Sequence, residues 1–89
     1  MLFMVIEKFI NNDPRPIYQR LDESGRMMPA ELTYVNSWIS EDLSTCWQVM
    51  ETESPEKFAD WIRHWDDLVQ FEIVPVMTSA EARAKTDRS

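Results

Sequence analysis

The stretch LTYVNSWISEDLSTCWQVMET, residues 32–52, decides the fold. Its two halves, 32–39 and 44–52, are rich in β-branched and aromatic residues, a composition that favours strands. The link between them, residues 40–43, is short and acidic, as expected of a hairpin connection. The segment therefore predicts two neighbouring antiparallel strands, around which the rest of the chain has to be arranged.

Two further strands are predicted on either side of this hairpin. Residues 2–9, LFMVIEKF, are apolar with little polar interruption and predict a first strand. Residues 69–77, VQFEIVPVM, predict a last strand, in which Pro75 fits only at an edge or a bulge because it has no N–H. The sheet should therefore have four strands.

The connections between these strands carry two helix signals. Each begins with a capping residue followed by a proline, Asp13–Pro14 in the first and Ser54–Pro55 in the second. The apolar periodicity then predicts helices over about 14–24 and 55–67, and the first should stop at Gly25. Trp61 and Trp65 lie on the apolar stripe of the second helix, where we expect them to be core residues.

The resulting order, β-α-β-β-α-β, is that of a ferredoxin-like α+β domain, in which four antiparallel strands carry two helices on one face. Residues 1–78 are expected to form this single domain. Residues 79–89 are small and polar and lack an apolar stripe, so they are expected to be a C-terminal tail with at most one frayed helical turn.

Charge and composition exclude several classes of function. Nine Lys and Arg against 16 Asp and Glu give a net charge of -7, so nucleic acid is not an expected partner. A single Gly leaves no glycine-rich phosphate loop. One Cys with one His cannot form an intrachain disulfide or a Cys/His zinc site, so no metal or cofactor site is predicted. The longest apolar run, MLFMVI, is far below the ~20 residues of a membrane span, and no basic region precedes a cleavable apolar segment. A cytoplasmic protein without a membrane partner is therefore expected.

The first, third and fourth predicted strands carry large apolar side chains on both of their faces, as Met4 and Ile6 opposite Phe3 and Val5 illustrate. Two short helices cannot cover both faces of a sheet, and a soluble monomer rarely exposes a large apolar patch. A second copy of the same sheet, related by a two-fold axis, is the simplest cover. We therefore expect a homodimer that pairs through the sheet faces.

The hairpin suggests which side chains would line the space between the two sheets. Val35, Trp47 and Val49 have the composition of a helix-facing set, whereas the opposite parity mixes amides with aromatic residues. That mixed set is predicted to enclose a small-molecule pocket, in which carboxylates such as Glu7 and Glu72 would need a partner if they share that side. The predicted ligand-binding residues are Tyr34, Asn36, Trp38, Gln48 and Met50, and Cys46 has the same parity.

Four segments of the chain, MLFMVIEKF, LTYVNSWI, CWQVMETESP and WDDLVQFEIVPVMTSAEA, together resemble a family of small bacterial proteins classed as a domain of unknown function. That family is similar in plan to the dimeric α+β barrel superfamily, whose ferredoxin-like subunits pair sheet to sheet. The superfamily includes quinone-forming and haem-degrading monooxygenases, lactone isomerases and proteins of no known activity. The resemblance therefore implies the fold and the dimer and leaves the reaction open.

Three hypotheses for the function follow. The first is a pocket between the sheets with cofactor-independent chemistry on a small aromatic or carbonyl compound, in which amides stabilise a developing oxyanion. The second is a structural or interaction module whose interface is packed shut. The third is haem handling, because haem-degrading relatives of the superfamily place a His on the second helix and an Asn on the sheet, where this chain has His64 and Asn36. A surface histidine paired with Asp60 or Asp67 is the alternative interpretation of His64.

Overall fold

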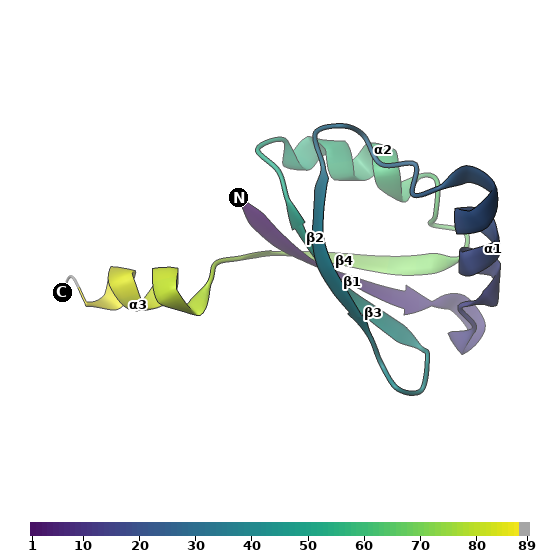
Figure 1. The fold of residues 1–89 in the computed structure, drawn as a ribbon, viewed down its shortest axis with the longest axis horizontal. Coiled ribbons are helices and arrows are strands. Elements are labelled where there is room, and N and C mark those ends of the chain that lie inside the picture. Colours follow the sequence, from purple (N-terminus) through teal and green to yellow (C-terminus); the bar gives the residue numbers. More distant parts are fainter. Residues whose placement is uncertain (88–89) are drawn as a thin grey trace.

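Four strands form one antiparallel sheet in the computed structural model, which describes residues 1–87 (Figure 1). The order across the sheet is β2-β3-β1-β4, so β1 and β3 are the central strands. The α+β class, the four strands and the hairpin predicted from the sequence are confirmed. The strands are β1 (Leu2–Phe9), β2 (Thr33–Ile39), β3 (Thr45–Glu51) and β4 (Val69–Val76).

The hairpin between β2 and β3 contains a bulge that changes the faces of β2. Tyr34 is opposite Met50, but the next pair along the ladder is Asn36 and Val49, so Val35 is an extra residue. One inserted residue breaks the alternation of side chains, because the two residues of a bulge oppose a single residue of the partner strand. Side chains of β2 that follow the bulge therefore lie on the opposite face of the sheet from the one that strict alternation would give them.

Helices α1 (Arg15–Ser24) and α2 (Phe58–Ile62) lie over the same face of the sheet (Figure 1). α1 begins beside Asp13, whose carboxylate accepts the Arg15 N–H (3.1 Å), and ends at Gly25, whose φ of 68° is one that other residues avoid. This agrees with the predicted boundaries within a residue.

The second helix is much shorter than the sequence predicts. A 3-10 turn (Pro55–Lys57) precedes α2, and the chain after Ile62 continues as tight turns rather than as helix. In these turns the N–H of His64 bonds to Trp61 O (3.0 Å) and that of Trp65 to Ile62 O (2.9 Å), which is three-residue spacing. The apolar stripe is nevertheless preserved, because Phe58, Trp61 and Trp65 are all buried.

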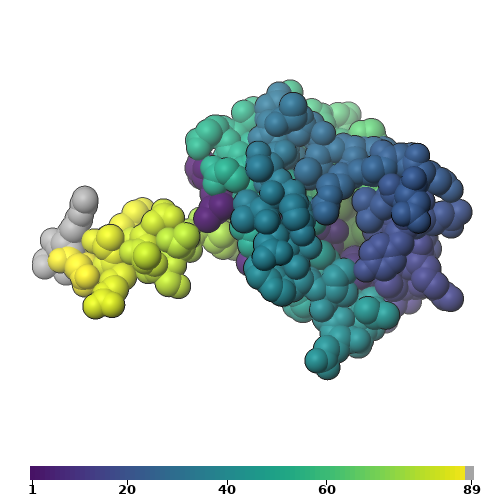
Figure 2. All heavy atoms as spheres, in the orientation of Figure 1, coloured from purple at the N-terminus to yellow at the C-terminus, as the bar shows by residue number. Residues whose placement is uncertain are grey.

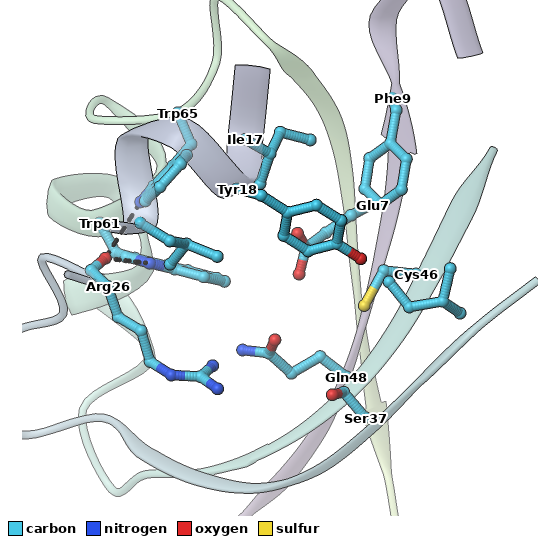
Figure 3. Close-up of a pocket in the computed structure, with 12 residues that line it drawn as sticks. Glu7, Phe9, Ile17, Tyr18, Arg26, Ser37, Cys46, Gln48, Trp61 and Trp65 are labelled. Atoms are coloured by element: carbon cyan, nitrogen blue, oxygen red, sulfur yellow. Dashed lines mark hydrogen bonds between the residues drawn. The ribbon is translucent and has the colours of Figure 1, made fainter. Parts of the chain in front are cut away.

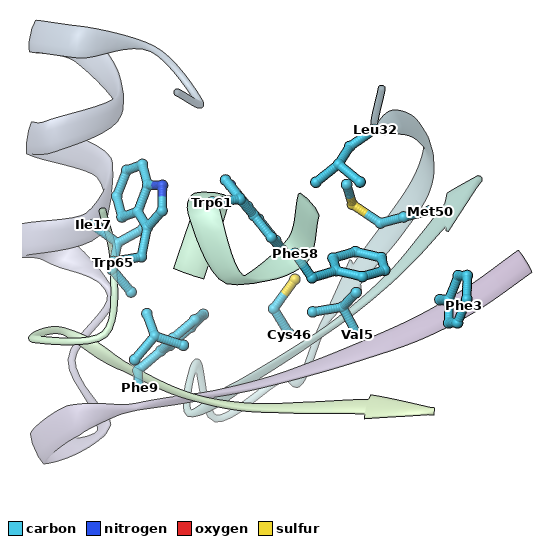
Figure 4. Packing of buried hydrophobic residues seen from close by; sticks show 11 residues of the cluster. Phe3, Val5, Phe9, Ile17, Leu32, Cys46, Met50, Phe58, Trp61 and Trp65 are labelled. Atoms are coloured by element: carbon cyan, nitrogen blue, oxygen red, sulfur yellow. The ribbon is translucent and has the colours of Figure 1, made fainter. Parts of the chain in front are cut away.

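The core lies between the covered face of the sheet and these two helices (Figure 4). At the end of the core near the start of β1, the rings of Phe3 and Phe58 pack edge to face, with 5.2 Å between their centroids. Met50 and Val5 are completely buried beside them. The buried apolar residues are Phe3, Val5, Phe9, Ile17, Leu32, Cys46, Met50, Phe58, Trp61, Trp65 and Val69.

No described helix covers the other face of the sheet, which we call the open face (Figure 1). Register places Met4 beside Val49 and Val74, and Ile6 beside Trp47, on this face. Trp38 is 55% exposed and Trp47 is 38% exposed. The open face is therefore apolar although nothing in residues 1–87 packs against it.

The segment after β4 forms helix α3 (Ser79–Thr86), where a frayed turn was expected. Thr78 caps it, because its side chain accepts the Glu81 N–H (3.1 Å). None of its residues is buried, and it stands clear of the rest of the molecule (Figure 2). None of the helices described in residues 1–87 has the length and apolar character needed to cross a membrane.

Candidate functional site

A cavity of about 260 Å³ lies between the covered face of the sheet and helix α1. We call it the Glu7 pocket, after the acidic side chain that points into it (Figure 3). Its walls are apolar and mostly aromatic, formed by Phe9, Ile17, Tyr18, Leu21, Trp61 and Trp65. Its polar groups belong to Glu7, Arg26, Ser37, Cys46 and Gln48.

Glu7 is on the covered face because it has the same parity as Phe3, Val5 and Phe9 on the central strand β1. Its neighbours across the ladder are Cys46 on β3 and Phe71 on β4. A side chain at this position cannot reach solvent along the strand, and Glu7 is only 9% exposed. Its Oε2 atom is buried and has no hydrogen-bond partner among the described residues.

Burial raises the pKa of Glu7 to about 7, and the positive charge of Arg26 offsets part of this effect. Desolvation disfavours the charged form of a carboxyl group, so the group is partly protonated at neutral pH. A carboxyl group in this state can either donate or accept a proton. Such perturbed groups in a pocket are candidates for a functional role.

Cys46 is the neighbour of Glu7 on β3 and is a buried free thiol. Burial, and then the negative charge of Glu7, raise the pKa of this thiol to about 12. A nucleophilic cysteine needs the opposite shift, toward the thiolate. Cys46 is therefore a neutral wall residue of the pocket.

Arg26 follows the glycine that ends α1 and is fixed by its backbone. The indole N–H groups of Trp61 and Trp65 both donate to Arg26 O, at 3.2 and 3.0 Å. Its guanidinium lies over the ring of Tyr34, 4.0 Å from the centroid. The two tryptophans of the predicted core stripe thus also hold the loop that carries a pocket residue.

Gln48 comes from β3 and its amide points into the pocket (Figure 3). The amide nitrogen donates to Met50 Sδ (2.7 Å), a weak acceptor. Ser37, on β2, shares a hydrogen bond with the Tyr34 hydroxyl (2.7 Å). The pocket therefore has an amide, a hydroxyl, a guanidinium and an unpartnered carboxyl group among aromatic walls.

The structure divides the five predicted ligand-binding residues between the two faces. Gln48 lines the Glu7 pocket, Met50 is buried in the core, and Tyr34 lies under Arg26. Asn36 and Trp38 lie on the open face, opposite Val49 and Trp47. Whether any of the five binds a ligand remains a prediction, but a single pocket formed by all of them is wrong.

The predicted assignment of the hairpin faces is wrong for two reasons. On β3, Cys46, Gln48 and Met50 face the helices, whereas Trp47 and Val49 are on the open face. The prediction assumed that the more polar parity is the less covered one. On β2, the bulge at Val35 places Tyr34 on the covered face and Asn36 on the open face, so Tyr34 and Trp38 cannot stack on the same ligand.

The two acidic side chains that were considered together are also separated. Glu7 is on the covered face, and Glu72 is opposite Ile6 on the open face. The sequence indicated that a carboxylate at Glu7 would need a partner, but not which side of the sheet holds it. The parity shared with Phe3, Val5 and Phe9 was the signal for the covered face, and no pattern in the sequence pointed to Arg26.

His64 is exposed and does not line the Glu7 pocket. It borders a shallow polar groove, and neither expected acidic partner is bound to it: Asp67 pairs with Arg20 (2.7 Å) and Asp60 pairs with Arg63. The geometry therefore gives no support to haem handling through this histidine. Asn36 bonds to the Ser37 N–H (2.8 Å) at the bulge.

Comparison with protein-family models gives a match that spans the whole chain. Residues 1–89 match the family described as a domain of unknown function, DUF3303. The chain belongs to this family. No curated protein and no solved structure matches it. The family supplies no reaction for the Glu7 pocket, so its function has to be argued from its geometry.

Proposed function

We propose that this DUF3303 domain binds a small, mostly apolar molecule in the Glu7 pocket and that the Glu7 carboxyl group is its polar contact. The observation that carries the proposal is the buried Oε2 atom of Glu7, which has no partner among residues 1–87 although it points into a cavity. Buried polar atoms are nearly always hydrogen-bonded, so an orphaned one in a cavity favours a ligand or a bound water. Aromatic walls favour a ligand with an apolar body.

The volume of the pocket limits the size of this molecule. A cavity of roughly 150 Å³ is enough for benzene in another protein. The Glu7 pocket, at about 260 Å³, is therefore large enough for one ring with a few substituent atoms. It is smaller than the ~300–1,000 Å³ of sites for drug-sized ligands, so a multi-ring molecule would extend beyond it.

The reaction class that this arrangement suits is proton transfer on a small carbonyl compound. Glu7, protonated when the molecule binds, would give its proton to one atom of that molecule and, as the resulting carboxylate, take a proton from another atom of it, so no co-reactant is needed. The Gln48 amide is placed to hydrogen-bond the oxygen that becomes negative. A base whose pKa is near the operating pH is the most effective one, and the shift of Glu7 toward neutrality supports this role.

An NMR titration with phenol, benzyl alcohol and benzamide tests the binding proposal. We expect these one-ring probes to shift the backbone amide signals of β1, β3 and α1 at millimolar concentrations. Cys46→Leu, which fills the pocket, should weaken binding at least tenfold. Thr45→Leu places the same side chain on the opposite face of β3 and should leave binding unchanged. If no probe shifts the signals of the pocket, or if both variants bind equally, the proposal is wrong.

We also propose that the subunit is ferredoxin-like and forms a homodimer through the open face. Support for the fold is the strand order, which from the other edge is β4-β1-β3-β2, with α1 and α2 on one side of the sheet. Support for the dimer is the apolar character of the open face. The cytoplasm is the proposed compartment, in keeping with the buried free thiol of Cys46.

The charges of the open face favour a second copy as its partner. Lys8 and Glu72 are exposed on this face, on adjacent strands, and no ion pair of either is found among the described residues. In a two-fold contact, Lys8 of one copy can meet Glu72 of the other and the reverse. An apolar patch that carries Lys8 and Glu72 is therefore complementary to itself.

Sedimentation equilibrium tests the dimer. Ile6→Lys, at the centre of the open face, should weaken association at least 100-fold, and Lys8→Glu should weaken it about tenfold. The double variant Lys8→Glu, Glu72→Lys should restore association, which a merely structural effect would not do. A folded wild-type monomer at 10 µM would overturn the dimer, and a dimer whose pocket binds no probe would favour the interaction module instead.

A further inference from the structure

Two charged side chains line the Glu7 pocket, Glu7 and Arg26. The proposed binding function uses Glu7 but assigns no role to the side chain of Arg26. Its backbone is held by two indole hydrogen bonds, and its guanidinium rests on the Tyr34 ring. Stacking on an aromatic face restrains a guanidinium without occupying its five N–H donors. Arg26 is thus a positioned cation whose donors remain available.

No carboxylate neutralises this cation within the described residues. Ion pairs are found for Arg15, Arg20 and Arg63, but Arg26 is in none of them. Its charge nevertheless reaches the interior of the pocket, because it lowers the pKa of both Glu7 and Cys46 against the effect of burial. The chain has a net charge of -7, so its average electrostatic potential is negative. The unpaired Arg26 makes the potential at this pocket locally more positive.

We infer that the Glu7 pocket is selective for small aromatic carboxylates, which Arg26 recognises at the mouth while the ring lies between the aromatic walls. This inference rests on the proposed binding function and adds the charge of the ligand. The planar fork of a guanidinium matches a carboxylate, to which it can donate two parallel hydrogen bonds. Trp61 and Trp65, which fix Arg26, also form the wall beside which the ring would lie.

The charge of Glu7 has to change when such an anion binds. The titratable side chains that line the pocket with Glu7 are Tyr18 from α1, Arg26 from the loop and Cys46 from β3, whereas β4 contributes Phe71 at the neighbouring position. The thiol is neutral, so Arg26 is the cation that has to balance any negative charge in the pocket. Glu7 is buried, and a second carboxylate beside it would disfavour its charged form further, so we expect the bound state to have Glu7 protonated.

Proton uptake gives the inference a measurable signature. Above pH 7 the free protein has to gain a proton before it binds the anion, so the affinity should fall by up to tenfold for each further pH unit. An uncharged probe of the same shape has no such requirement. In the Glu7→Gln variant the dependence should disappear, because the amide does not titrate.

Isothermal titration calorimetry with sodium benzoate and benzamide tests the inference. Benzoate should bind wild-type protein at least tenfold more tightly than benzamide at pH 6.5, and this preference should disappear in Arg26→Gln. Arg26→Lys should keep part of it, and Arg63→Gln, which removes an exposed arginine outside the pocket, should keep all of it. Measurements in two buffers of different ionisation enthalpy should show uptake of about one proton at pH 8.

The outcomes separate this inference from the function on which it rests. If benzamide binds as tightly as benzoate, or if Arg26→Gln keeps the preference, the charge selectivity is wrong and the binding proposal stands. If neither compound binds the wild-type pocket, both are wrong. Backbone amide spectra of Arg26→Gln show whether the variant is folded. If it is not, the partial loss of preference expected for Arg26→Lys is the test, and an unchanged preference in that variant would overturn the selectivity.

Discussion

The two faces of the sheet differ in a way that polarity alone does not suggest. The face under the helices contains a buried acid, an amide and a thiol, in Glu7, Gln48 and Cys46. The open face is apolar at its centre, where Met4 and Ile6 lie beside Val49 and Trp47. Buried polar groups need partners, whereas exposed apolar surface needs a cover. The two faces are therefore the basis of two different proposals: a ligand for the covered face and a second copy for the open face.

The covered face is itself divided into two parts. Toward the start of β1, Phe3 and Val5 belong to the same buried cluster as Phe58 and Met50 (Figure 4). Toward its end, Glu7 lies below a cavity instead of a side chain. The first part contains the completely buried side chains of Val5 and Met50, and the second part contains the proposed site, as expected when a packed core positions a site.

The largest expected change is in the free energy of unfolding, and it distinguishes the buried core from the open face. Met50→Ala removes a completely buried side chain and should lower the free energy of unfolding by about 2–5 kcal/mol. Val49→Ala, the adjacent residue on the open face, should cost about 1 kcal/mol within the subunit, because the side chain is only half buried. Urea unfolding followed by circular dichroism measures both.

Protein concentration separates the two contributions. The loss in Met50→Ala should be the same at 2 and 50 µM, whereas that in Val49→Ala should vary with concentration if the open face is a dimer contact. Equal losses in the two variants at every concentration would mean that the faces are equivalent, contrary to the comparison.

The next effect concerns the pH dependence that Glu7 gives to stability. Burial raises its pKa from 4.5 to about 7, so below pH 4.5 the group is protonated in both the folded and the unfolded state. Between these values the folded state holds more protons, and stability should fall as the pH rises. Above pH 7 the full cost of the buried charge is reached, roughly 3 kcal/mol for a shift of this size.

Comparison of two isosteric variants isolates this contribution. Glu7→Gln should remove the fall in stability between pH 5 and pH 8, measured by urea unfolding at fixed protein concentration. Glu72→Gln removes an exposed carboxylate from the open face and should keep the wild-type dependence. If the two variants have the same slope, Glu7 is not ionising in a desolvated position.

Much of the fold was predictable because it depends on local signals. Strand β1 begins and ends where the apolar run predicts, and α1 ends at Gly25, which has the positive φ that the prediction required. The length of α2 was not predictable from its apolar stripe, because tight turns after Ile62 bury Trp65 as well as a continuous helix would. Periodicity therefore identified the buried residues more reliably than the secondary structure that presents them.

The candidate site was not predictable in the same way, because it depends on which parity faces the helices. A single inserted residue, Val35, reverses the faces of β2, and no turn residue in the sequence marks it. Arg26 is placed by hydrogen bonds from residues 35 and 39 positions away, which no local pattern encodes. Of the site residues, only Glu7 could have been placed from the sequence, because the residues with the same parity on β1 are large and apolar.

A smaller effect tests the link between the helix layer and the pocket. Trp65→Phe removes one of the two indole donors to Arg26 O and should cost about 1 kcal/mol of stability. Because Arg26 is then held less firmly, benzoate binding should weaken a few-fold. Trp47→Phe makes the same change on the open face and should leave benzoate binding unchanged. Equal binding by the two variants would show that the indole bond does not position Arg26.

The smallest effect is expected for helix α3, which tests whether the open face belongs to a second copy. Its eight residues have no buried side chain, and helices shorter than about 12 residues are marginal in isolation. A chain that ends at Thr78 should therefore unfold within ~0.5 kcal/mol of the full chain and should keep both its dimer and its pocket. This is also the boundary of the domain predicted over residues 1–78. If the shortened chain becomes a monomer, then α3 contributes to covering an apolar surface, and the open face alone does not account for the association.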